Sequence, residues 1–339
     1  MRHLLGHRPF FATPIRLLWV AFVMLSGLAC QPQAERLTAV ETTTPSTATV
    51  LGRREYGIRQ HLTLVNEGPG QPEKQNIWVA LIQTVPPYQE VQSREITPKE
   101  YTLVSDENGN QYAEFDFSDH PAGTTKMVQI DYRLVVNELG YDLDNCEGEL
   151  LDVFTQPELH IESANPQIMA LAKELSREKK NACQKVRAFY DYIGDELVYT
   201  YNGRNWGAQA ALGDMGADCT EYASLQVALS RAQGIPARYY EGLLYLENDT
   251  KNLARLEHAW AEVYLPGTGW VSLDPTLGRI PLQRETYFAH HTPEHIIVTM
   301  GASPSTLRGS SYWTHLYWPG TSTKIRVEAG KWEIEPVEK

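Results

Sequence analysis

A cysteine at the predicted start of a buried helix is the feature that most constrains how this chain folds. Asp218 is a favoured N-cap residue, and Glu221, three positions later, completes a capping-box pattern that places Cys219 at the first helical position. The face of this helix that packs is apolar: Tyr222, Leu225, Ala228, Leu229 and Ala232. Gly234 then favours a left-handed turn. The sequence therefore predicts a buried helix that begins at Cys219 and stops before Gly234.

The chemistry open to Cys219 depends on its surroundings. A thiol in the first turn of a helix lies among unpaired backbone N–H groups at the positive end of the helix dipole, which favours the thiolate. For a lone cysteine, however, an inert buried thiol is the better interpretation. A nucleophile becomes the better interpretation when a base and an orienting group lie nearby.

A predicted β-hairpin downstream of this helix supplies a histidine and an aspartate. His258 begins a strand over 258–265, residues 266–269 form a Pro-Gly-Thr-Gly turn, and the return strand over 270–273 ends at Asp274. Folding around this turn brings His258 within a few residues of Asp274 across the hairpin. A thiol–imidazole pair needs such a carboxylate, which holds one imidazole nitrogen so that the other faces the sulfur.

Several sequence blocks, in this order, resemble the transglutaminase-like superfamily. They are Gly216–Ala223, Gly234–Arg238, His258–Val263 and Gly269–Thr276. The resemblance covers roughly residues 165–276, and the β-rich region before it is similar to the domain that precedes this core in bacterial members. The resemblance implies that Cys219 is the nucleophile, His258 the general base and Asp274 its orienting partner.

The resemblance also implies the fold and the reaction. The fold class is α+β, with a papain-like core in which the helix carrying the cysteine packs on an antiparallel sheet, preceded by an all-β sandwich domain. The reaction is acyl transfer at an amide bond, in which the thiolate forms a thioester that water or an amine resolves. Alternating apolar residues in 125–136 and a hairpin turn at 106–110 support the sandwich independently. We expect no cofactor.

Three further residues are candidates for supporting the site. Asp218 and Glu221 hold the start of the helix that carries the thiol. The backbone N–H of Cys219 is one candidate oxyanion donor, and the indole N–H of Trp206 is another, although Trp206 is equally compatible with a core or rim position. Ala217, inserted directly before Asp218, departs from the commonest family pattern and predicts a shifted loop before the cysteine.

Composition, together with the resemblance, divides the chain into six expected segments. Residues 1–29 form a signal peptide of the lipoprotein type, and residues 30–48, which are polar and rich in threonine, form a flexible tether. The remaining segments are a β-sandwich domain (49–140), a connector (141–164), a transglutaminase-like catalytic core (165–285) and a C-terminal β extension of that core (286–339).

The N-terminus indicates export. Three arginines precede an uncharged apolar run over 17–29, which is too short to span a bilayer comfortably. The run ends at Cys30 in a sequence that resembles a lipoprotein box, apart from Gly27 where an aliphatic residue is usual. An ordinary signal peptide cut near Ala29 is the alternative. We therefore expect a bacterial cell-envelope protein that is lipid-anchored at Cys30 and faces the periplasm, with the outer membrane favoured over the inner.

Two more cysteines, Cys146 and Cys183, remain after Cys30 is assigned to lipid and Cys219 to chemistry. In an exported chain such a pair can form a disulfide. Spacing alone leaves open whether these two residues meet.

Charge and histidine content narrow the partners. The chain carries a net charge of −12, and about −15 without its arginine-bearing leader, which argues against nucleic acid or an anionic membrane surface as the main partner. His290, His291 and His295 form a cluster that lacks accompanying cysteines or suitably spaced carboxylates. We therefore expect solvated loop histidines there rather than a metal site. The sequence gives no indication of oligomeric state.

Several function classes are compatible with this sequence. The leading hypothesis is a cysteine peptidase or amidase that acts on a protein or peptide substrate. The same triad serves a cross-linking transglutaminase, in which a lysine amine rather than water resolves the thioester. The alternative from another class is a catalytically inactive binding or scaffold protein of the cell envelope, against which an intact triad argues. A thiol-redox protein is disfavoured because Cys219 has no nearby partner cysteine.

Overall fold

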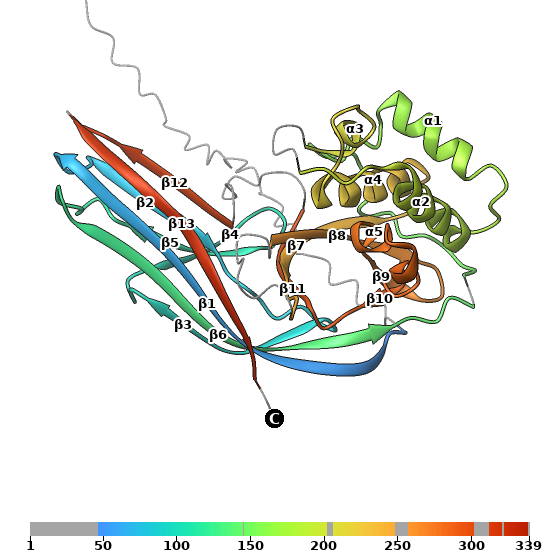
Figure 1. The fold of residues 1–339 in the computed structure, drawn as a ribbon, viewed down its shortest axis with the longest axis horizontal. Helices are drawn as coiled ribbons and strands as arrows, with labels where there is room; N and C mark the ends of the chain where they lie inside the picture. The colour runs from blue at the N-terminus through green and yellow to red at the C-terminus, as the bar shows by residue number, and fades with distance from the viewer. Residues whose placement is uncertain are drawn as a thin grey trace, which may run out of the picture. The chain divides into compact units, whose positions relative to one another are not determined.

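The computed structural model describes residues 47–144, 146–201, 206–247, 257–301, 312–320 and 322–337. The expected signal peptide, Cys30 and nearly all of the expected tether therefore lie outside the described residues. Within the described part of the chain, no helix is both long enough and apolar enough to cross a membrane. The fold is α+β, as the sequence predicts, with two sheets that form a sandwich and a third sheet that is covered by helices (Figure 1).

The larger sheet of the sandwich combines strands from both ends of the chain. Its order is β10–β6–β1–β13, and β3 also pairs with β6. The strands are β1 (Thr49–Pro69), β3 (Gln89–Thr97), β6 (Thr125–Gly140), β10 (His290–His291) and β13 (Thr323–Pro336). Alternate residues of β6 are buried, namely Val128, Ile130, Tyr132, Leu134 and Val136. This is the period-two pattern of a strand with one face in a core.

The smaller sheet packs against the larger one through apolar side chains. Its order is β12–β2–β5–β4. The strands are β2 (Lys74–Ala80), β4 (Thr102–Ser105), β5 (Gln111–Asp116) and β12 (Trp313–Trp318). The expected turn at 106–110 joins β4 to β5, and the Asp106 side chain accepts hydrogen bonds from the amides of Asn108 and Asn110. One buried cluster draws on both sheets, with Leu64, Ile77, Phe115 and Leu134 among its members, as expected of a β-sandwich.

A four-stranded antiparallel sheet and its helices form the other half of the fold, between β6 and β12 in the chain. The sheet order is β11–β7–β8–β9. Its strands are β7 (Ala237–Leu244), β8 (Glu257–Leu265), β9 (Gly269–Leu273) and β11 (His295–Met300). The helices are α1 (Pro166–Leu175), α2 (Ala182–Glu196), α3 (Ala208–Ala211), α4 (Cys219–Ala232) and α5 (Pro275–Gly278), followed by a short 3₁₀ helix, η2 (Pro281–Gln283). In Figure 1, α1 to α4 lie on one side of this sheet.

Helix α4 lies at the centre of this half. Residues 221–231 are all buried. Apolar side chains of α4 share a core with small side chains of β8, including Ala259 and Ala261, which let the helix approach the sheet closely. Gly234 has a φ of 69°, in the left-handed region that glycine adopts without strain. The predicted start and stop of this helix are therefore those observed.

The C-terminal segment differs from the expectation. The sequence predicts that residues 286–339 extend the catalytic core, and β11 does join the core sheet by pairing with β7. However, β12 pairs with β2, and β13 pairs with β1, so that Tyr56 lies opposite Pro336. The last two strands therefore complete the sandwich. Pairing between such distant segments leaves no local pattern from which it could be recognised.

The two halves share buried side chains and hydrogen bonds. Tyr88, which precedes β3, packs with Trp260 and Ile297 of the core sheet. The Gln89 side chain donates to the backbone oxygen of Ile297 and accepts from its amide, both at 2.8 Å. Buried Glu262 of β8 accepts a hydrogen bond from the Tyr88 hydroxyl. These contacts fix the face of the core sheet that carries Trp260.

Candidate active site

The capping box at the start of α4 places Cys219 where the sequence predicts. The Asp218 carboxylate accepts a hydrogen bond from the Thr220 amide at 3.0 Å, and Glu221 accepts one from the Asp218 amide at 2.8 Å. Cys219 is a free, partly exposed cysteine. As the first residue of the helix it has no intrahelical partner for its own N–H, so this amide can bind an oxyanion.

Glu221, two residues after Cys219, is fully buried, which disfavours its charged form. Burial raises the pKa of Glu221 to about 7, against the opposing effect of the hydrogen bond from the Asp218 backbone. The carboxyl group is therefore only partly ionised near neutral pH. This reduces its repulsion of a thiolate at Cys219.

His258 and Asp274 meet as the hairpin predicts. His258 is the second residue of β8, Asp274 directly follows β9, and the two strands pair with Ala261 opposite Leu273. Nε2 of His258 lies 2.8 Å from Oδ2 of Asp274. Both side chains are buried, with His258 8% and Asp274 2% exposed. This contact leaves Nδ1 of His258 to face a thiol.

The charge of Asp274 dominates the protonation of His258. Burial by itself lowers the pKa of His258, but the negative charge and hydrogen bond of Asp274, together with contact with Cys219, raise it to about 10. The thiol and the imidazole are thus close enough to interact. At neutral pH the imidazole is protonated and can pair with a thiolate, which is the reactive form of cysteine.

Asp274 is held at both carboxylate oxygens. Oδ1 accepts a hydrogen bond from the Leu277 amide at 2.9 Å, because Asp274 is also the N-cap of α5. Burial by itself would raise the pKa of Asp274, but the charges and hydrogen bonds of His258 and His295 hold it well below its ordinary value. Asp274 is therefore a carboxylate throughout the neutral range.

His295 is a site residue that the sequence prediction missed. The sequence predicts that His290, His291 and His295 are solvated loop histidines, but His291 is 1% and His295 3% exposed. Nε2 of His295 lies 3.0 Å from Oδ2 of Asp274, the oxygen that also contacts His258. The apolar strand that begins at His295 was the available signal. Its approach to Asp274 depends on long-range pairing that the sequence does not display.

His258, Asp274 and His295 offer atoms of the kinds that bind metals. One ligand atom from each lies within 4.8 Å of the others. In the structure Oδ2 of Asp274 hydrogen bonds to both imidazoles. We therefore interpret the set as a buried hydrogen-bond network.

His258 and His295 both pack against the ring of Trp260. The Trp260 ring centroid lies 6.2 Å from that of His258, nearly parallel to it, and 5.0 Å from that of His295, edge to face. Gly242 on β7 makes room for this arrangement. A Cβ atom at Gly242 would lie 2.8 Å from the Trp260 ring and would overlap the backbone oxygen of Ile296. Because Gly242 has no side chain, the Trp260 ring fits at the position where both His258 and His295 pack against it.

Trp206 and Ala217 both precede α4 in the sequence. Trp206 is 54% exposed, and its ring contacts that of His160 at 5.9 Å. Trp206 is therefore exposed rather than part of the core, and its role as an oxyanion donor stays a prediction. Ala217 is buried, and its backbone accepts from Thr200 at 2.8 Å and donates to Val198 at 3.1 Å. The residue inserted before the N-cap is therefore anchored by a local bridge.

Cys146 and Cys183 form a disulfide with Cα atoms 6.0 Å apart and a sequence separation of 37 residues. The bond joins the segment before the helices to α2. Both cysteines belong to the buried cluster that contains α4. The disulfide therefore ties the connector to the core that positions Cys219.

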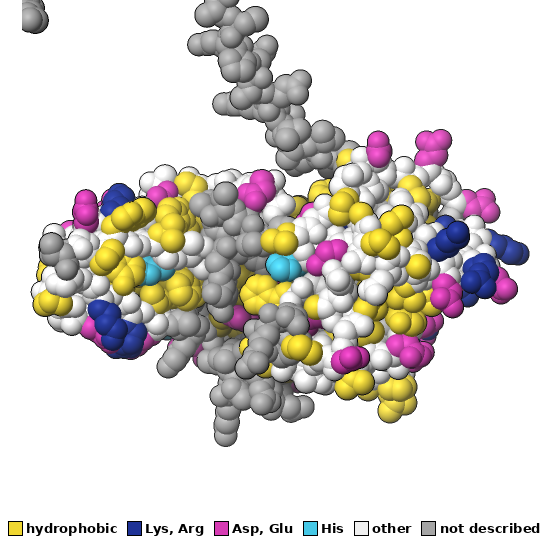
Figure 2. All heavy atoms as spheres, turned by 90° about the horizontal axis from the view of Figure 1, so that it is seen from above, with side chains coloured by type: hydrophobic (Ala, Val, Ile, Leu, Met, Phe, Trp, Pro, Cys, Tyr) yellow, Lys and Arg dark blue, Asp and Glu magenta, His cyan; other side chains and the backbone are white. Residues whose placement is uncertain are grey.

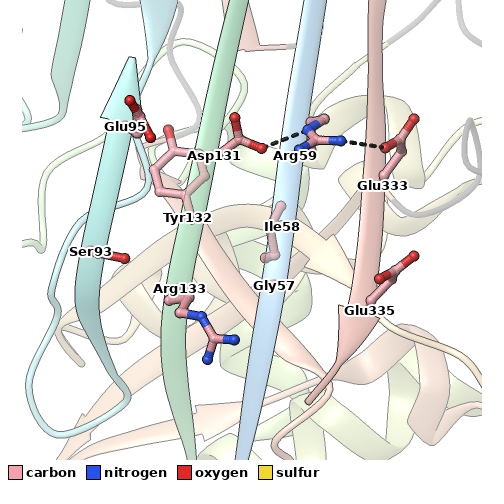
Figure 3. Close-up of a pocket in the computed structure, with 10 residues that line it drawn as sticks. All are labelled: Gly57, Ile58, Arg59, Ser93, Glu95, Asp131, Tyr132, Arg133, Glu333 and Glu335. Carbon is pink, nitrogen blue, oxygen red and sulfur yellow. Dashed lines mark hydrogen bonds and ion pairs between the residues drawn. The ribbon is translucent and has the colours of Figure 1, made fainter.

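A shallow hollow on the sandwich is lined by side chains from β1, β3, β6 and β13 (Figure 3). Arg59 pairs there with Asp131 at 2.6 Å and with Glu333 at 3.9 Å. Neither a cysteine nor a histidine lines this hollow. Since the hollow offers no nucleophile or general base of this kind, we do not assign it to the chemistry of Cys219.

Residues 169–275 match the family model described as the transglutaminase-like superfamily. This segment contains Cys219, His258 and Asp274, and it is a transglutaminase-like domain within the chain. His295 and strands β11 to β13 lie beyond the matched residues.

Two curated relatives are each 32% identical to part of this chain. One is the uncharacterised protein YebA of Bacillus subtilis, matched over 135 residues, or 34% of this chain and 18% of that protein. The other is a protein-glutamine gamma-glutamyltransferase of Pseudomonas aeruginosa, matched over 122 residues, or 33% of this chain and 18% of that protein. The matches thus span less than a fifth of the length of either relative.

A solved structure from Cytophaga hutchinsonii, titled "Putative Cysteine Protease", shares the fold more completely. It superposes with a TM-score of 0.62 at 17% sequence identity and covers 86% of this chain and 93% of that chain. The coverage extends well beyond the transglutaminase-like domain. The combination of sandwich and core is therefore common to both proteins.

Proposed function

We propose that this protein is a cell-envelope cysteine enzyme that hydrolyses amide bonds in proteins or peptides. The observation that carries the proposal is the buried contact between His258 and Asp274, 2.8 Å long, beside a cysteine at a helix start. The raised pKa of His258 supports an imidazolium that pairs with a thiolate at Cys219. A pure scaffold protein would not need Cys219, His258 and Asp274 together.

The proposed reaction begins with attack by the Cys219 thiolate on the substrate carbonyl carbon. A C–S bond forms, and the oxyanion accepts a hydrogen bond from the Cys219 backbone N–H. The His258 imidazolium then gives its proton to the leaving nitrogen, the C–N bond breaks, and a thioester remains. Water attacks this thioester, neutral His258 takes the proton from the water, and the acid is released with the thiolate restored.

Cross-linking is the second candidate, because one curated relative is named a protein-glutamine gamma-glutamyltransferase. In that reaction a primary amine replaces water at the thioester. The two outcomes separate when purified protein is incubated with glutamine-containing peptides and a fluorescent amine. We expect peptide cleavage or deamidation to dominate, and amine incorporation without hydrolysis would overturn this preference.

The surface leading into α4 supports a peptide substrate. Tyr201 is 81% exposed, Trp206 54% and Met215 48%. Figure 2 shows exposed hydrophobic side chains over the helical half of the molecule. Large apolar side chains of this kind favour contact with an extended peptide or an unfolded segment. Profiling cleavage of a peptide library tests this, with enrichment of apolar residues near the scissile bond as the expected result.

We further propose that the protein faces the periplasm and is anchored by lipid at Cys30. The Cys146–Cys183 disulfide supports an oxidising compartment. Growing cells with an alkyne-labelled fatty acid tests the anchor, because the wild-type chain would incorporate the label and Cys30→Ala would not. Labelling of both chains, or of neither, would contradict the proposed anchor.

The alternative of an inactive scaffold predicts an ordinary thiol. Iodoacetamide alkylation at pH 7 distinguishes the two classes without knowledge of the substrate. We expect Cys219 to react faster than a free cysteine and His258→Ala to slow it markedly. An ordinary rate that His258→Ala leaves unchanged would exclude the enzyme.

A further inference from the structure

The carboxylate of Asp274 binds a second imidazole in addition to that of His258. Oδ2 lies 2.8 Å from Nε2 of His258 and 3.0 Å from Nε2 of His295. All three side chains are at least nine-tenths buried. His295 thus contacts the same carboxylate oxygen as His258, the histidine that interacts with Cys219.

Both imidazoles donate to this oxygen. Asp274 is ionised, and an ionised carboxylate can only accept hydrogen bonds. Nε2 of His295 must therefore carry a proton. Nδ1 of His295 lies 2.8 Å from the Thr292 hydroxyl, which can donate to it. Thr292 thus provides a hydrogen bond at Nδ1 that orients the His295 ring with Nε2 towards Asp274.

The surrounding structure holds the His295 ring in place. His295 opens β11 opposite Leu244 of β7, and its ring meets that of Trp260 edge to face. Its titratable neighbours are Asp274, His258 at 5.8 Å, His291 at 5.7 Å and Tyr287 at 6.1 Å, the last three measured between ring centroids. The ring is therefore fixed by packing on its faces and by a hydrogen bond at each nitrogen.

We propose that His295 is a positioning residue that orients Asp274 and, through it, the catalytic imidazole of His258. This inference rests on the proposed function and adds a fourth member to the triad. Oδ1 is held by the Leu277 amide, so the His295 contact fixes the remaining rotation of the carboxylate about its own axis. The direction of Oδ2 in turn sets the direction in which Nδ1 of His258 faces Cys219.

Removing the hydrogen bond from Nε2 of His295 to Asp274 should slow the reaction at Cys219 more than it weakens substrate binding. In His295→Leu the carboxylate loses one of its charge-assisted hydrogen bonds and gains freedom to turn, so that His258 spends less time aligned with the thiol. We expect a loss of about tenfold in kcat with little change in KM, and an equal loss in the alkylation rate of Cys219 at pH 7. His295→Gln can place an amide N–H near the position of Nε2 and should restore most of the rate.

The test compares four variants of the full chain with the wild type. They are His295→Leu, His295→Gln, Thr292→Val and, as the matched control, His120→Gln, since His120 is also a buried histidine but its ring nitrogens contact Gln75 and Thr124 on the sandwich. We expect Thr292→Val to lose severalfold in rate because the His295 ring loses its hydrogen bond at Nδ1, and the control to stay within about twofold of the wild type. Thermal unfolding of each variant separates loss of fold from loss of alignment.

The outcomes distinguish this inference from the proposed function. Wild-type rates in His295→Leu, with slow alkylation in His258→Ala, would overturn the role of His295 and leave the enzyme intact. Equal losses in His295→Gln and His295→Leu, with no loss in Thr292→Val, would also overturn it, because packing alone would then explain the effect. Slow alkylation of the wild type that His258→Ala leaves unchanged would remove both proposals. If His295→Leu does not fold, retained rate in His295→Gln with loss in Thr292→Val supports the role.

Discussion

Replacing Asp274 with asparagine tests the electrostatic basis of the site. The carboxylate lies 2.8 Å from His258, and opposite unit charges at this separation attract by about 6 kcal/mol at an effective dielectric constant of about 20. The rise in the pKa of His258 from 6.5 to about 10 corresponds to a net preference of about 5 kcal/mol for the imidazolium. The two magnitudes agree, so the carboxylate can supply the whole shift.

Without this charge, burial opposes the imidazolium and only the contact with Cys219 favours it. We expect the pKa of His258 in Asp274→Asn to fall to 6.5 or below. At pH 7 the protonated fraction then drops from nearly all to about a quarter or less. We therefore expect kcat/KM for peptide cleavage to fall by about 10²- to 10⁴-fold, and alkylation of Cys219 to slow by at least about tenfold.

The alkylation assay can be read at Cys219 alone. Trypsin cleavage after Arg204 and Arg231 releases a peptide in which Cys219 is the sole cysteine, and mass spectrometry then follows its modification across pH. Asp131→Asn is the matched control, because Asp131 pairs with Arg59 on the sandwich. An Asp274→Asn profile that overlays the wild type from pH 5 to pH 10 would refute the electrostatic argument.

Three other perturbations test the supporting structure. Replacing Cys146 and Cys183 with serine should lower the free energy of unfolding by about 4 kcal/mol, from the entropy of a 37-residue loop, and an equal loss after reduction of the wild type is the check. Gly242→Ala should destabilise the fold and lower activity by displacing Trp260; a chain with unchanged melting temperature and kcat would contradict the packing argument. The contribution of His258 to stability should be complete below pH 6.5 and vanish as pH rises through about 10. The difference in unfolding free energy between wild type and His258→Gln should shrink over that range, and a constant difference would count against the raised pKa.

Local sequence rules predict well the helix that begins at Cys219 and the hairpin that carries His258 and Asp274. The capping box of Asp218 and Glu221 is a contact between residues three apart, and it forms as expected. The His258–Asp274 contact follows from a hairpin whose turn is only four residues long. In both cases the partners are brought together by local geometry, which short sequence patterns encode.

The parts that were missed depend on pairing across the whole chain. His295 reaches Asp274 because β11 adds to the core sheet beside β7, and no spacing rule signals that arrangement. The pairing partners of β12 and β13 could not be predicted for a similar reason. An alternating pattern indicates that a segment is a strand, but it does not indicate which strand it pairs with. The burial of His291 was missed for the same reason.

The pairing of β1 with β13 makes the helical half an insertion within the sandwich. Of these strands, β1 is synthesised first and β13 last. One edge of β1 therefore has no partner strand until residues 323–336 have been synthesised. Sheets closed by such distant segments form slowly, because a long loop must be ordered before the contacts form. We therefore expect the helical half, with its local hairpin, to fold first. The sandwich would then close last. Its closure buries Tyr88 against Trp260, the ring on which His258 and His295 pack.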